Sequence, residues 1–181
     1  MFSTILVAID NSAASDRAFQ SALELAQGLK ADLILVHALD IFDAASPERP
    51  AIAATSYSIQ LDEMLRRSYE QRWSEFVAHY DALLRQKQEE AGAAGVRASY
   101  IQPYGRPGPV ICEAARGSDA DLIVVGNRDR SGIRELILTS TSSYLVHHAP
   151  CSVTVVHAKN SQHHAPHKGA TLGAAVAGHA P

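Results

Sequence analysis

Four short runs of apolar residues constrain the fold of this chain more than any other feature. The runs are rich in Val, Ile and Leu, are apolar at successive rather than alternate positions, and occupy residues 4–9, 32–38, 121–125 and 152–157. Such runs are typical of strands that are buried on both faces of a parallel sheet. A fifth run, residues 97–102, is more polar, and we expect it at an edge of the same sheet.

Helical patterns separate these runs. Apolar residues recur every three or four positions in residues 14–29, where residues 11–13 offer an N-cap, and again in a longer segment, residues 61–83. Two shorter helices are predicted, one after Pro107 and one over about residues 140–148. The order β-α-β-α-β-α-β-α-β predicts an α/β fold, a doubly wound parallel sheet of five strands with helices on both faces.

The chain is expected to form one domain. Its 181 residues fit a single unit, which we expect over residues 1–158. Residues 41–60 are rich in Pro, Ala and Ser and predict an insertion before the long helix. Residues 159–181 contain no aromatic residue and many Ala, Gly and His, so we expect a disordered tail there.

The composition bears on compartment and partners. A formal net charge of −3 argues against a broad basic face and therefore against sequence-independent binding of nucleic acid. Two cysteines are too few for a disulfide framework. No apolar run approaches the roughly 20 residues that span a bilayer. We therefore expect a cytoplasmic protein whose partners include neither nucleic acid nor a membrane.

The position of a ligand follows from the expected topology. In doubly wound sheets, ligands bind beyond the carboxyl ends of the strands, where the strand order reverses. Residues 10–12 follow the first strand, residues 126–132 follow the fourth, and the hydroxyls of residues 140–143 open the next helix. Loops of this kind cradle phosphate through backbone N–H groups, although turns also use Gly and Ser for purely structural reasons.

Three separated segments carry a resemblance to a known family. They are ILVAIDNS at residues 5–12, DLIVVGNR at residues 121–128, and STSSYLVHHAPCSVTVV at residues 140–156. Over residues 1–158 the chain resembles universal stress proteins of the UspA type. The resemblance implies a Rossmann-like sheet of the adenine nucleotide α-hydrolase kind with strand order 3-2-1-4-5. It also implies a homodimer formed through the last strand, with Val153, Val155 and His157 at the interface.

One subgroup of that family binds ATP through the pattern Gly-x2-Gly-x9-Gly followed by Ser or Thr. Here the corresponding residues are Gly126, Asp129, Thr139 and Ser140, so the first glycine and the hydroxyl are kept and two glycines are replaced. The resemblance places a nucleotide at ten residues: Asp10 and Ala38 near adenine and ribose; Val125, Gly126 and Arg128 along the nucleotide; Asp129 and Thr139 at the replaced glycines; and Ser140, Thr141 and Ser142 at the phosphates.

The two replacements predict weak binding. A carboxylate at Asp129 about 4 Å from a phosphate charge costs roughly 1–4 kcal/mol at effective dielectrics between 80 and 20. Thr139 adds a β-branched side chain where glycine permits a close backbone approach. The binding of AMP, which carries fewer phosphates than ATP, is expected to be weakened less. Mg²⁺ is the alternative, because it would turn Asp129 into a ligand shared with phosphate.

Three functions remain open on the sequence. The first is a homodimeric stress-response protein that binds ATP or AMP weakly. The second is an interaction or scaffold dimer that binds no nucleotide. The third, a slow ATP hydrolase, is disfavoured because the chain lacks a Gly-x4-Gly-Lys-Ser/Thr loop and a convincing set of nucleophile and base. We therefore expect a binding or regulatory protein rather than an enzyme.

Other conspicuous residues have structural interpretations. The aromatic residues Tyr69, Trp73, Phe76 and Tyr80 recur at helical spacing and are expected in the core or at a dimer contact. Cys112 and Cys151 are expected to be small core residues. No group of His and Cys residues has the spacing of a metal site.

Overall fold

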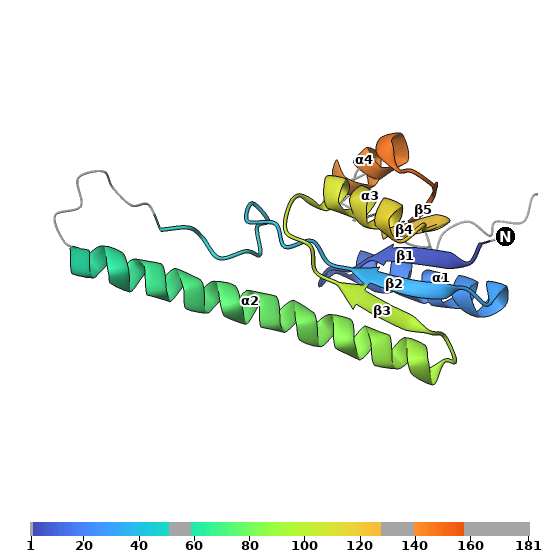
Figure 1. The fold of residues 1–181 in the computed structure, drawn as a ribbon, viewed down its shortest axis with the longest axis horizontal. Coiled ribbons are helices and arrows are strands. Elements are labelled where there is room, and N and C mark those ends of the chain that lie inside the picture. Colours follow the sequence, from blue (N-terminus) through green and yellow to red (C-terminus); the bar gives the residue numbers. More distant parts are fainter. Residues whose placement is uncertain (1, 51–58, 128–139, 158–181) are drawn as a thin grey trace, which may run out of the picture.

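The computed structural model describes residues 2–50, 59–127 and 140–157. Strands and helices alternate through these residues (Figure 1). In chain order the elements are β1 (Thr4–Ala8), α1 (Ala13–Leu29), β2 (Asp32–Val36), α2 (Ile59–Ala93), β3 (Ala98–Ile101), α3 (Pro107–Gly117), β4 (Leu122–Gly126), α4 (Ser140–His148) and β5 (Ser152–Val156). Every predicted helix and strand is therefore present.

The sheet has five parallel strands in the order β3-β2-β1-β4-β5. At its centre, Ile5 of β1 lies opposite Leu33 of β2 and Leu122 of β4. This is the predicted doubly wound order 3-2-1-4-5, and the order reverses between β1 and β4. The more polar β3 lies at an edge, as predicted, because the central strands are buried on both faces and select apolar residues.

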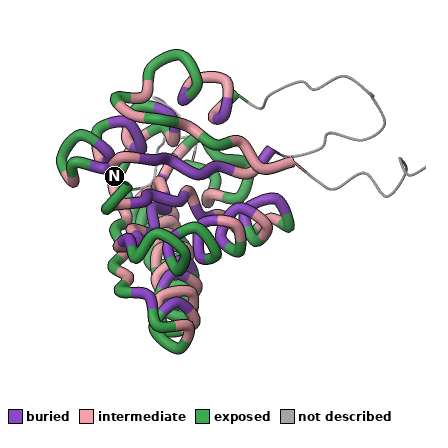
Figure 2. Tube along the Cα trace, turned by 90° about the vertical axis from the view of Figure 1, so that its right-hand side faces the viewer, coloured by how far each residue is buried: buried purple, intermediate pink, exposed green. Residues whose placement is uncertain are grey.

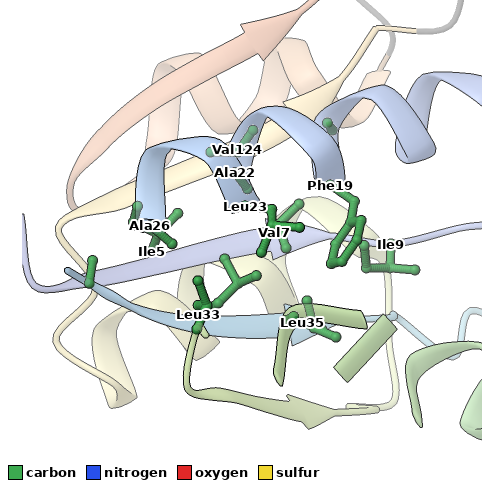
Figure 3. Packing of buried hydrophobic residues seen from close by; sticks show 14 of the residues in the cluster. Ile5, Val7, Ile9, Phe19, Ala22, Leu23, Ala26, Leu33, Leu35 and Val124 are labelled. Atoms are coloured by element: carbon green, nitrogen blue, oxygen red, sulfur yellow. The ribbon is translucent and has the colours of Figure 1, made fainter. Parts of the chain in front are cut away.

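Helices cover the sheet on both faces. Strand residues Ile5 and Val7 pack in a cluster with Phe19 of α1 and Leu84 of α2, whereas Leu6 packs on the other face in a cluster with Leu145 of α4. Figure 3 shows Phe19 pointing from α1 towards β1. Fully burying a side chain of this size stabilises the fold by roughly 1.5–3 kcal/mol. In Figure 2, buried residues run along the strands at the centre of the molecule.

Helix α1 is capped at both ends, and its N-cap is one of the residues predicted for that role. The N-cap is Ser12, whose Oγ accepts a hydrogen bond of 3.2 Å from the N–H of Ser15. At the other end, Lys30 adopts a left-handed conformation with φ of 56° and its N–H bonds to the carbonyl of Ala26. These caps satisfy backbone groups that a helix leaves unpaired at its ends.

Helix α2 is much longer than the sheet that it packs against. Its 35 residues span about 52 Å, whereas a strand of five residues spans about 17 Å. The buried residues of α2, which are Tyr80, Leu84 and Ala91, all lie in its second half. The first half, residues 59–75, extends past the sheet (Figure 1). We call residues 59–75 the projecting half of α2.

The predicted insertion lies partly, and the predicted tail wholly, outside the described residues. Of the predicted insertion at 41–60, residues 59 and 60 belong to α2 and residues 51–58 lie outside the described residues. The predicted tail, residues 159–181, also lies outside them. Within the described ranges, no helix has the length and apolar character needed to cross a membrane.

Candidate functional site

The carboxyl end of β1 is held in place by the first turn of α1. The N–H of Asp10 donates to Ser15 Oγ at 2.9 Å, and that hydroxyl donates to the carbonyl of Ala8 at 3.5 Å. Asp10 is half-buried there. Because the strands are parallel and the order reverses between β1 and β4, Asp10 lies at the position where doubly wound folds bind ligands.

Gly126 brings α1 and β4 close together at the same edge of the sheet. A Cβ atom on Gly126 would lie 2.3 Å from the carbonyl oxygen of Ala14, in the first turn of α1. Only glycine therefore fits at this position. On the sequence, Gly126 was assigned to nucleotide binding or to a turn, since the contact with α1 joins residues 112 positions apart and leaves no local pattern.

The end of β2 lies beside Asp10. The N–H of Ile9 donates to the carbonyl of Val36 at 2.8 Å, and the Nδ1–H of His37 donates to the carbonyl of Ile9 at 2.8 Å. Ala38, the next residue, is half-buried. Asp10 and Ala38, which the resemblance assigns to adenine and ribose, are thus brought to neighbouring strand ends.

The hydroxyls predicted to face phosphates differ in exposure. At the start of α4, Ser140 is exposed, Thr141 is half-buried, and Ser142 is fully buried. A ligand reaches Ser140 and Thr141 more readily than Ser142. The helix N-terminus itself favours an anion through its free N–H groups and its dipole.

The loop after β4, which the resemblance assigns to a nucleotide, lies only partly within the described residues. Val125 is buried in the cluster that includes Leu6, so its side chain serves packing. After Gly126, Asn127 is buried and its N–H donates to the carbonyl of Val156 at 2.8 Å. Arg128, Asp129 and Thr139 lie outside the described residues, so their assignment stays a prediction.

Strand β5 forms the other edge of the sheet and carries the predicted interface residues. Val153 and Val155 lie opposite Ile123 and Val125 of β4 and are half-buried. Among the described strands, β4 is the only neighbour of β5. His157 follows the strand, and its Nδ1 lies 3.2 Å from Asn127 Nδ2. This contact joins the end of β5 to the start of the loop after β4.

A ladder of aromatic rings connects α2 with the carboxyl ends of β2 and β3. The ring of His37 stacks on Tyr80 with centroids 3.6 Å apart and an interplanar angle of 10°. Phe76 lies 5.0 Å from Tyr80 and 5.3 Å from Trp73, and Trp73 lies 6.2 Å from Tyr104. Of the four aromatic residues predicted on this helix, Tyr80 is buried, whereas Tyr69, Trp73 and Phe76 are half-buried.

His37 is a buried residue of this region that the sequence patterns did not single out. The residue is 6% exposed, and burial lowers the pKa of its imidazole below the ordinary value, outweighing the opposing effects of the Ile9 carbonyl and of Asp10. The signal in the sequence is its spacing, because residue 37 shares a face with Leu33 and Leu35 of β2. That face packs against α1 and α2.

A surface groove and two cysteines lie away from the carboxyl ends of β1 and β2. A shallow groove of about 590 Å³ between α3 and α4 is lined by Pro109, Cys112, Glu113, Arg116, Gly117 and Tyr144. Cys112 is buried and Cys151 is half-buried, and burial raises the pKa of both thiols. Both cysteines pack with the cluster that includes Leu6, which agrees with the predicted core role. The described ranges contain no group of three His, Cys, Asp or Glu residues able to hold a metal ion.

The chain is similar to known proteins over most of its length. The sequence model of the universal stress protein family matches residues 1–157. Universal stress protein YxiE of Bacillus subtilis is 30% identical over 156 residues, which cover 86% of this chain and 99% of that protein. The structure of universal stress protein UspA from Lactobacillus plantarum matches with a TM-score of 0.63 and 27% identity, covering 86% of this chain and 97% of that one. A universal stress protein crystallised in complex with cAMP matches with a TM-score of 0.59 and 25% identity, again over 86% and 97% of the two chains.

Proposed function

Because the chain belongs to the universal stress protein family, we propose that it is a homodimeric stress-response protein that binds an adenine nucleotide weakly. One observation carries the proposal. Asp10, Ala38, Gly126 and the start of α4 all lie at the carboxyl ends of the strands, around the place where the strand order reverses. The similarity to a family member crystallised with cAMP supports an adenine ligand.

Each part of the nucleotide has a proposed partner. Adenine and ribose lie near Asp10 and Ala38, and the phosphates lie at the start of α4, near Ser140 and Thr141 and the charge of Arg128. Free N–H groups and the dipole of α4 favour the phosphates there. AMP binds more tightly than ATP in this proposal, because Asp129 repels each added phosphate charge.

The protein binds rather than catalyses in this proposal. At the described part of this edge, the Ser15 hydroxyl accepts from the backbone N–H of Asp10 and the His37 ring bonds to the Ile9 carbonyl, so both side chains hold the strand ends together rather than activate a nucleophile. The second candidate is a dimer that acts through its surfaces without nucleotide. The replacement of two motif glycines by Asp129 and Thr139 is the observation that favours it.

The dimer forms through β5 in this proposal. Antiparallel pairing of residues 153–157 across a twofold axis would pair the open edge of the sheet. Val155→Lys is expected to yield a monomer in light scattering, since it places a charge in the interface. Val146→Lys on α4, where the side chain is 48% exposed, is the matched control and should remain dimeric. If the Val155→Lys protein stays dimeric, the interface lies elsewhere on the surface.

Calorimetric titration tests the nucleotide proposal. ATP and AMP are titrated with and without Mg²⁺ into the natural protein, into an Asp129→Gly/Thr139→Gly variant, and into Asp10→Asn. We expect weak binding by the natural protein, tighter binding by the double variant and loss of binding by Asp10→Asn.

The other outcomes distinguish the alternatives. If the natural protein binds no nucleotide and the double variant does, the dimer that acts through its surfaces is favoured. If neither binds, the proposed site is wrong. Tighter binding of ATP with Mg²⁺ than without it would support a role of Asp129 as a metal ligand.

A further inference from the structure

His37 lies between the proposed adenine position and α2. On one side, its Nδ1–H bonds to the carbonyl of Ile9, the residue before Asp10. Its own backbone leads directly into Ala38. On the other side, its ring stacks on Tyr80 of α2 at 3.6 Å. One side chain therefore contacts both the strand ends that hold the proposed adenine site and the long helix.

The second ring nitrogen of His37 is adapted to the neutral state. Because a carbonyl can only accept, the bond to Ile9 requires the proton on Nδ1 and leaves a lone pair on Nε2. Nε2 is buried and has no hydrogen-bond partner among the described residues. Protonation would create there a buried N–H donor without an acceptor, together with a positive charge, and both are unfavourable in a protein interior.

We propose that His37 is a positioning residue that joins α2 to the adenine end of the nucleotide site, and that protonation of its ring loosens this junction. The inference rests on the proposed nucleotide site for its binding consequence, but not for the contact between His37 and α2. Under mildly acidic conditions, α2 would pack less tightly on the ends of β2 and β3, and Asp10 and Ala38 would lose their fixed spacing.

Burial of the ring, rather than the charged groups around it, determines the direction of the effect. Asp10 at the end of β1 and Asp43 in the segment after β2 favour the protonated ring, whereas His79 of α2 disfavours it. Burial is the largest effect and lowers the pKa of His37 below the ordinary value of 6.5. The ring is therefore neutral at pH 7. The stability that it contributes is present above pH 6.5 and is lost as the pH falls below that value.

The single tryptophan of the chain provides a direct readout. Trp73 lies on α2, with its ring 5.3 Å from that of Phe76 and in the same aromatic ladder as His37. Tryptophan fluorescence of the full chain is measured between about pH 8 and pH 5, the range in which histidines titrate. We expect a transition with its midpoint below pH 6.5. The transition should disappear in His37→Phe, which keeps a ring against Tyr80 but does not titrate, and should persist in His79→Gln.

Nucleotide binding provides the second readout. AMP affinity is measured at both ends of the same pH range, and we expect about fivefold weaker binding at the acidic end. The phosphate of AMP also titrates near pH 6, so the effect attributed to His37 is the part that His37→Phe abolishes. His37→Asn keeps an N–H donor for the Ile9 carbonyl but has no ring. Its AMP affinity should likewise show only the pH dependence that comes from the phosphate of AMP.

The two readouts distinguish a failure of the His37 proposal from a failure of the proposed nucleotide site. A transition in Trp73 fluorescence that persists unchanged in His37→Phe would overturn the inference, as would AMP binding whose pH dependence is the same in that variant. A His37-dependent transition without binding of AMP at any pH would refute the proposed nucleotide site and the binding consequence, while supporting the junction between His37 and α2.

Discussion

Helices α1 and α2 cover the same face of the sheet but have different roles. Helix α1 has 17 residues, of which seven are buried, and it presses so closely on β4 that Gly126 has no room for a Cβ atom. Helix α2 has 35 residues, of which three are buried. Helix length and helix burial are therefore separate properties. Burial by α1 stabilises the fold and shapes the site, whereas most of α2 presents surface.

The projecting half of α2 is stabilised mainly by its own sequence. Arg66 pairs with Glu70 and Arg67 pairs with Glu63, each pair with a distance of 2.5 Å and four residues apart. Such pairs support a helix in water by a few tenths of a kcal/mol each. The second half of α2 is held by tertiary contacts. Leu84 is fully buried in the cluster that includes Ile5 and Val7, and Tyr80 stacks on His37.

The largest predicted difference between the two helices comes from truncating a buried and an exposed side chain. Phe19 of α1 is fully buried, so Phe19→Ala is expected to lower the free energy of unfolding by about 3–5 kcal/mol. Met64 in the projecting half of α2 is 61% exposed, so Met64→Ala should change it by less than about 0.5 kcal/mol. Urea denaturation of both variants measures the two values. Equal losses would show that the projecting half is buried in solution.

A second prediction compares two Gly→Ala substitutions at the α1 layer. In Gly126→Ala the new Cβ meets the Ala14 carbonyl, and we expect a loss of about 1–3 kcal/mol in the free energy of unfolding, since α1 must move. Gly28→Ala in α1 has open space around the new methyl group and should stabilise by about 0.5–1 kcal/mol. Urea denaturation measures both. A neutral Gly126→Ala would mean that α1 approaches β4 less closely than described.

The smallest predicted effect concerns an ion pair on the projecting half of α2. Both partners of the Arg66–Glu70 pair are more than half exposed. Arg66→Ala is therefore expected to lower the free energy of unfolding by about 0.3–0.5 kcal/mol at low salt, and by less at high salt because ions screen the pair. Thermal unfolding at two salt concentrations measures the change. A loss above 1 kcal/mol would indicate a further contact of Arg66.

The sequence predicted the elements of the fold because their signals are local. Successive apolar positions identified the buried strands, and the more polar run at residues 97–102 identified the edge strand β3. Ser12 was a predictable N-cap, since it needs only the N–H of Ser15, three residues away. For the proposed nucleotide site, the positions of Asp10, Ala38 and Ser140 at strand and helix ends were predictable for the same reason, through the motifs of the family.

Only the tertiary structure decided which faces meet. The helical spacing of Tyr69, Trp73, Phe76 and Tyr80 predicted one apolar stripe, but only Tyr80 is buried, because the sheet is too short to cover the rest of α2. Likewise, no local pattern pairs Gly126 with Ala14 or the His37 ring with both Ile9 and Tyr80. The sequence by itself determined the strands, the helices and their caps, which depend on residues within a few positions of one another. The packing of α1, the projection of α2 and the surroundings of His37 depend on residues far apart in the chain, and only the folded arrangement of the layers brings them together.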